Sequence, residues 1–113
     1  MEIIRESLTL QALKEMAAAL FGDMVKAVVD VDRERMAVNA ELHSDLEALL
    51  LEDGSKQASL WGINLYPELQ GGDFLEFDSM INVRPSQHNR SRDVLDPWIR
   101  KKIIAIVEKK IQR

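Results

Sequence analysis

Cysteine is absent from this chain of 113 residues, which excludes disulfide bridges, zinc–thiolate sites and thiol nucleophiles. Aromatic side chains make up only 5% of the residues, so the core must be built mainly from aliphatic side chains. No run of about 20 apolar residues occurs, and the first residues lack the apolar segment of a signal peptide. We therefore expect a cytoplasmic protein without a membrane-spanning segment.

An excess of positive charge is also lacking. The formal net charge of -4 argues against sequence-independent binding to nucleic acid, which requires a broad basic face. Charge is nevertheless uneven, because residues 41–53 contain five acids and no Lys or Arg, whereas residues 84–92 contain three arginines and no acid. The length and the 46% hydrophobic content predict one globular domain spanning residues 1–113.

Three segments have the signals of amphipathic helices. Thr9 is a candidate N-cap for a helix over residues 10–21, and Asp96 with Pro97 is typical of the start of a helix that reaches residue 111. Between them, Ser44 and Glu47 have the spacing of a capping box for a helix that ends near residue 53.

The remaining apolar segments read as strands. Ile3 and Ile4 form a short apolar pair that predicts an edge strand. Alternating or β-branched patterns predict further strands over residues 24–32, 35–42, 61–66 and 74–84. The first two of these are separated only by a short polar break and predict an antiparallel hairpin.

The order β-α-β-β-α-β-β-α predicts an α+β fold with two layers, in which an antiparallel or mixed sheet carries its helices on one face. We expect the helices to cover one apolar side of the sheet, formed by Val25, Val29, Val38, Ile63 and Ile81. The other side would then be polar and would present Asn39, Glu41, Asn64, Tyr66, Glu76, Asp78, Asn82 and Arg84.

Four segments carry a resemblance to a known family. They are residues 21–30, residues 41–43, the string Trp-Gly-Ile-Asn-Leu-Tyr-Pro at 61–67 and the string Phe-Asp-Ser-Met-Ile-Asn-Val-Arg-Pro-Ser-Gln at 77–87. Together they resemble a family of small bacterial and archaeal proteins catalogued as a domain of unknown function. The resemblance extends over almost the whole chain and implies a free-standing domain. It also implies glycine where this chain has His88, and often where it has Asp93.

The loop over residues 82–92 is rich in hydrogen-bond donors and positive charge. Its candidate ligand-binding residues are Asn82, Arg84, Ser86, Gln87, Asn89, Arg90 and Arg92. Arginine binds carboxylate or phosphate in a bidentate manner, and the amides and hydroxyls add neutral donors. The same side chains can instead pair with acids of the protein or satisfy turn backbone, and the sequence leaves both interpretations open.

A second set of polar side chains lies at the predicted junction of residues 41–45. His43 with Glu41 is a weak candidate for an acid–base pair. Together with Asp45 they carry nitrogen and oxygen atoms of the kind that bind metals, but one histidine and two acids are common by chance. We therefore predict no metal site and no cofactor.

These observations support three interpretations. The first is a small non-catalytic domain that binds an anionic ligand or an acidic protein surface through the 82–92 loop. The second is an enzyme with a site between Glu41 or His43 and Arg84 or Arg90, in which arginines act as electrostatic clamps. The third is a homodimer that uses the polar face of the sheet, with the loop as an internal brace. The sequence alone does not decide among them.

Overall fold

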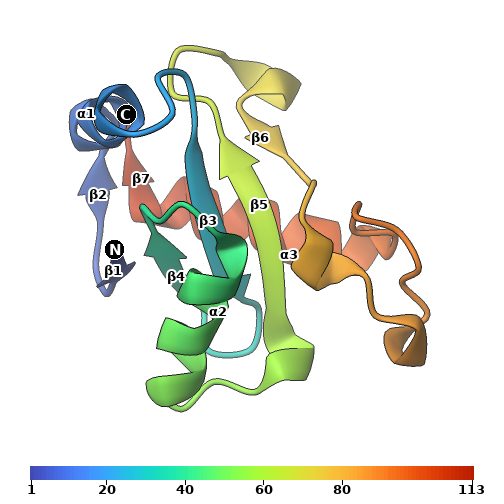
Figure 1. Cartoon of the computed structure of the whole chain (residues 1–113). Coiled ribbons are helices and arrows are strands. Elements are labelled where there is room, and N and C mark those ends of the chain that lie inside the picture. Colours follow the sequence, from blue (N-terminus) through green and yellow to red (C-terminus); the bar gives the residue numbers. More distant parts are fainter.

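The structure, a computed structural model, describes all 113 residues and has an α+β fold (Figure 1). Its main sheet has five antiparallel strands in the spatial order β1 (Glu2–Ile4), β4 (Arg35–Val38), β3 (Val25–Asp30), β5 (Leu60–Leu65) and β6 (Leu75–Glu76). A separate parallel pair joins β2 (Leu8–Thr9) to β7 (Ile111–Gln112). The antiparallel sheet, the edge position of β1 and the β3–β4 hairpin confirm the predictions.

Three helices pack against the main sheet: α1 (Leu10–Ala19), α2 (His43–Glu52) and α3 (Pro97–Lys110). The predicted N-caps of two helices are confirmed, since the Thr9 side chain accepts a bond from the Ala12 N–H and Asp96 accepts one from the Trp98 N–H. The predicted capping box is wrong. Helix α2 begins two residues earlier than this box implies, at His43 rather than Asp45, and has no side-chain cap. None of the helices combines the length and the hydrophobicity that a membrane-spanning helix requires.

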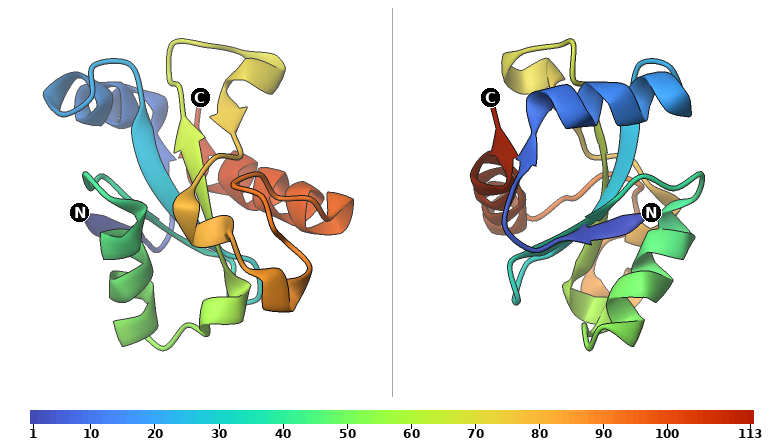
Figure 2. Two further views of the ribbon diagram at one scale, coloured as in Figure 1. Left: turned by 45° about the vertical axis from the view of Figure 1, so that its right-hand side comes forward. Right: turned by 90° about the vertical axis from the view of Figure 1, so that its left-hand side faces the viewer.

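The helices lie on both faces of the sheet, so the prediction of two layers with all helices on one face is wrong (Figure 2). Helices α1 and α3 bury the larger core, which includes Val25, Val29, Val38 and Ile63 as predicted. Helix α2 covers a second, smaller core on the opposite face, built from Val28, Ala37, Ala40, Leu46, Leu50 and Leu60.

The physical reason lies in strand β3, which is apolar on both sides. Ala27 and Val29 belong to the larger core, whereas Val28, between them, belongs to the smaller one. A strand that is buried on both faces shows a continuous apolar run rather than strict alternation. Ile81, predicted to face the larger core, packs against the smaller one instead.

Two predicted strands are shorter in the structure. The strand predicted over residues 35–42 ends at Val38, because Asn39 adopts a left-handed conformation with φ 74°. The strand predicted over residues 74–84 is reduced to Leu75–Glu76. Beyond it the chain forms two short 3₁₀ helices, η3 (Met80–Asn82) and η4 (Pro85–Gln87). Residues 77–95 therefore form a long irregular segment beside β5.

Candidate functional site

A polar pocket of about 420 Å³ opens on the α2 face of the sheet. The start of α2 contributes Ser44 and His43, strand β5 contributes Asn64, and the segment after it contributes Tyr66. The remaining polar lining residues are Lys26, Glu76, Asp78, Ser79 and Arg92. This pocket contains Asn64, Tyr66, Glu76 and Asp78 of the predicted polar face, whereas α2 packs on the same side of the sheet over Val28, Ala37 and Leu60.

Gly62 allows the pocket walls to approach the sheet. A Cβ atom at this position would lie 2.5 Å from both Cβ and Oγ of Ser79, and 3.2 Å from Cδ2 of His43. Any side chain at this position would therefore displace the start of η3 and the start of α2. A glycine in the middle of a strand often marks such a close approach.

His43 is almost fully buried, and its Nε2 lies 2.8 Å from the carbonyl oxygen of Ile63. Because a carbonyl only accepts hydrogen bonds, Nε2 must carry the hydrogen. Burial lowers the pKa of the imidazole below its ordinary value, more than the bond to Ile63 raises it. The ring is therefore neutral near pH 7. The bond through Nε2 is the one hydrogen bond of the ring, so the Nδ1 lone pair is free.

Asn64 leaves an acceptor without a partner in the same pocket. Its Nδ2 donates to Oε1 of Glu76 at 2.8 Å and to the carbonyl oxygen of Asp78 at 3.1 Å, which fixes the orientation of the amide. The Oδ1 atom is buried and has no hydrogen-bond partner. Leaving such an acceptor unpaired costs about 1–3 kcal/mol, so this atom favours a ligand or water that donates a hydrogen bond.

The charges of the pocket are only partly paired. Arg92 Nε donates to Oδ1 of Asp78 at 2.6 Å, which leaves the terminal nitrogens of the guanidinium free. Lys26 has no carboxylate partner, and its ammonium lies 5.3 Å from the centre of the Phe21 ring. Glu76 accepts bonds from Asn64 and, at 3.0 Å, from the Tyr66 hydroxyl, both through the same oxygen. Partial burial and, to a lesser extent, the nearby Glu76 carboxylate raise the pKa of Tyr66.

Two predicted ligand-binding asparagines are buried and fully engaged inside the protein. Asn82 exchanges two hydrogen bonds with the backbone of Gly62, at 2.8 and 2.9 Å, and also donates to the Arg92 carbonyl oxygen. Asn89 donates to three backbone carbonyls within 3.0 Å and accepts a bond from the Leu95 N–H. Both amides hold the irregular segment in place and have no free capacity for a ligand.

Arg84 and Gln87 tie the loop to the turn that precedes β5. The Arg84 guanidinium stacks 4.2 Å from the centre of the Trp61 ring and donates to the carbonyl oxygens of Gln57 and Leu60. Burial lowers the pKa of Arg84, although the group remains charged at neutral pH. Gln87 Nε2 donates to the Ala58 carbonyl oxygen at 3.0 Å.

The structure thus places the seven predicted ligand-binding residues of the loop in different surroundings. Arg92 is the one that lines the polar pocket, where it lies together with His43. Ser86 and Arg90 are exposed, and neither side chain has a hydrogen-bond partner. Glu41 is exposed and does not line the pocket. No group of three or more His, Asp or Glu side chains is arranged to hold a metal ion.

Sequence reasoning missed the pocket residues Lys26, Ser44 and Ser79 as parts of a site. Lys26 offered a signal, because it is a charged residue within a mainly apolar strand. In the structure it pairs with Asn64 across β3 and β5. Ser79 offered none, because its place depends on the fold of the irregular segment.

Fold and pocket together define a small α+β domain with one polar pocket between a helix start and an irregular segment. The chain belongs to the family described as "Protein of unknown function (DUF5674)", which matches residues 2–110. This membership confirms the resemblance noted above. Comparison with curated proteins and with solved structures gives no match.

Proposed function

We propose that this protein binds a small polar molecule in the pocket of His43, Asn64 and Arg92. The ligand would carry an anionic group, such as a carboxylate or a phosphate, and a hydrogen-bond donor, such as an amino or hydroxyl group. The observation that carries the proposal is the buried, unpartnered Oδ1 of Asn64 in a pocket that also contains an unpaired lysine.

The charges match such a ligand. Lys26 and the free nitrogens of Arg92 would hold the anionic group. Asn64 Oδ1, His43 Nδ1 and the second carboxylate oxygen of Glu76 would accept hydrogen bonds from the donor group. In this proposal the loop contributes to anion binding through Arg92, rather than through all of residues 82–92.

A panel of amino acids, hydroxy acids and phosphate monoesters tests the proposal by thermal shift and titration calorimetry. A ligand at a hundredfold excess over Kd stabilises the folded state by about 2.7 kcal/mol. Binding should be lost in Lys26→Met, which keeps the apolar stem but removes the charge. It should persist in Lys14→Met, which removes a half-buried lysine whose partner is Glu68, away from the pocket. The absence of any saturable shift, or unchanged binding in Lys26→Met, would contradict the proposal.

A second candidate function is proton transfer within the same pocket. The neutral His43 ring has its Nε2–H held by Ile63, so its free Nδ1 is able to accept a proton from a bound ligand. A ligand found in the panel should then exchange a carbon-bound hydrogen in D₂O, as followed by NMR. His43→Gln should abolish the exchange and retain binding. If the parent protein binds the ligand but does not exchange this hydrogen, the proton-transfer function is refuted and only the non-catalytic function remains.

A further inference from the structure

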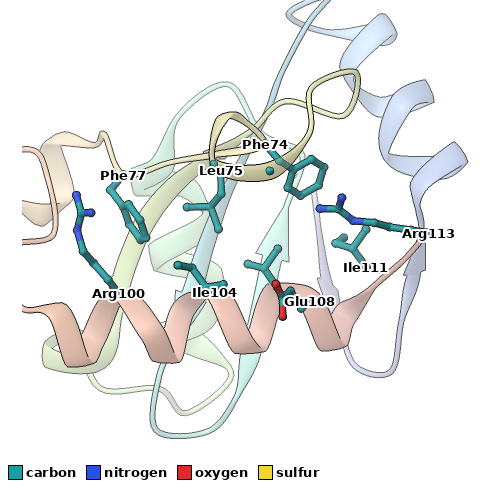
Figure 3. Close-up of a pocket in the computed structure, with 11 residues that line it drawn as sticks. Phe74, Leu75, Phe77, Arg100, Ile104, Glu108, Ile111 and Arg113 are labelled. Carbon is teal, nitrogen blue, oxygen red and sulfur yellow. The ribbon is translucent and has the colours of Figure 1, made fainter.

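A second cavity, larger and mainly apolar, lies on the other face of the molecule, between α3 and the segment around β6 (Figure 3). It is an open groove of about 760 Å³, within the range of roughly 300–1,000 Å³ that is usual for sites of small molecules. Its apolar lining comes from two walls and consists of Phe74, Leu75, Phe77, Ile104, Val107 and Ile111. Ile104 is 41% exposed although it lies in this apolar groove.

An arginine stands at each end of the groove, and each stacks on a phenylalanine (Figure 3). The Arg100 guanidinium lies 4.5 Å from the centre of the Phe77 ring and is also held by Asp93, at 2.6 Å, and by the Val94 carbonyl. The Arg113 guanidinium lies 4.1 Å from the centre of the Phe74 ring and has no carboxylate partner. The free cation is therefore at the Arg113 end.

We propose that this groove binds a single-chain amphiphile with an anionic head group. The apolar tail would lie between Leu75 and Ile104, and the head would bind the Arg113 guanidinium. The eleven residues of α3 from Arg100 to Lys110 span about 15 Å of groove, enough for an extended chain of about a dozen carbons. This site is separate from the polar pocket, since the two linings share no residue.

An acyl tail suits the groove better than an extended peptide does. A peptide in an apolar groove must find partners for its backbone N–H and C=O groups. The strand that borders the groove, β6, is an edge strand but has only two residues, so it offers few such partners. An acyl chain has no backbone groups to satisfy and gains from burial of its apolar surface.

Because the head group is anionic, removing a positive or a negative charge from the groove should change the affinity in opposite directions. The lining contains one acid, Glu108, which has no ion-pair partner. Arg113→Gln should weaken the binding of an anionic amphiphile about tenfold, the loss expected for one charge-assisted hydrogen bond. Glu108→Gln should tighten it by a few-fold, because it removes an unfavourable charge. General damage to the fold would weaken binding in both variants.

Dodecanoate below its micellar concentration is the probe, with binding measured by calorimetry and located by amide NMR shifts. Ile104→Asp should abolish binding, because it places a charge where the tail lies. Lys101→Gln is the matched control, since it removes a positive charge from α3 outside the groove and should leave affinity unchanged. Dodecyltrimethylammonium, with the same tail and a positive head, should bind at least tenfold more weakly.

Several results would overturn the proposal. They are the absence of saturable dodecanoate binding, equal affinity for the cationic amphiphile, shifts centred on the polar pocket, and preferential binding of an acidic peptide with alternating apolar residues. The variants Lys26→Met and Arg113→Gln keep the two sites distinguishable. The first should affect only the polar pocket and the second only the groove.

Discussion

Gly62 provides the sharpest test of how this fold builds its pocket. In Gly62→Ala the new Cβ would lie 2.5 Å from two side-chain atoms of Ser79, whereas carbon atoms in contact are normally about 3.5–4.0 Å apart. The start of η3 must therefore move by about 1 Å or the strand must bend. Such overpacking typically costs about 1–3 kcal/mol, partly offset by roughly 0.5–1 kcal/mol from the lower flexibility of alanine.

A double-mutant cycle separates this clash from other effects. Ser79→Gly removes both of the Ser79 atoms that would lie 2.5 Å from the new Cβ, and by itself costs the weak cap bond that the Ile81 N–H donates to Oγ. The double variant should therefore be more stable than the sum of the two single changes predicts, by about 1–2 kcal/mol.

Urea denaturation followed by circular dichroism measures all of these free energies of unfolding. Gly72→Ala is the control, since a Cβ at that position meets no atom within 4 Å. The reasoning would be refuted by a Gly62→Ala midpoint equal to that of the parent, or by additive effects of the two changes at 62 and 79.

Three further predictions follow from buried and strained residues. Because burial lowers the pKa of His43 in the folded state, the contribution of this residue to stability should be complete above about pH 6.5 and should decrease as the pH falls through the folded pKa. The measurement is the difference in free energy of unfolding between the parent and His43→Gln across pH 5–8. A difference that does not change with pH would contradict the prediction. His88 has φ 60°, a conformation that costs residues other than glycine about 1–2 kcal/mol. His88→Gly should therefore raise the free energy of unfolding by up to about 1 kcal/mol. The control, Ser86→Gly in η4, should lower the free energy of unfolding. Ile103 is fully buried in the larger core, so Ile103→Ala should lower the free energy of unfolding by about 2–5 kcal/mol in urea denaturation. Ile81→Ala, at a half-buried position, should lower it by less. The opposite order would show that α3 contributes little to the core.

The sequence alone was sufficient for features that depend on neighbouring residues. The side chains of Thr9 and Asp96 cap the helices that follow them, as the local patterns predict. The polar break between β3 and β4 produces the predicted hairpin. His88, where the resemblance implies glycine, has the left-handed backbone that glycine adopts most readily. Each of these features is decided within a few residues of chain.

Only the tertiary structure decided which face of the sheet each helix covers. The apolar side of α2 is visible in the sequence, but its partner on the sheet is a patch of small and aliphatic residues around Val28 and Ala37. Such short residues, interleaved with those of the larger core, produce no separate periodic signal. The predicted exposed polar face was therefore wrong over the part that α2 covers.

The arrangement of the 82–92 loop was likewise decided by distant contacts. Arg84 and Arg92 have the same side chain and lie eight positions apart, yet one stacks on the buried Trp61 and the other lines the polar pocket beside Asp78. Asn82 is drawn inward because Gly62 exposes backbone groups that its amide can satisfy. Sequence specifies the chemical groups of a loop, but the roles of these groups depend on which buried donors and acceptors the folded chain brings next to them.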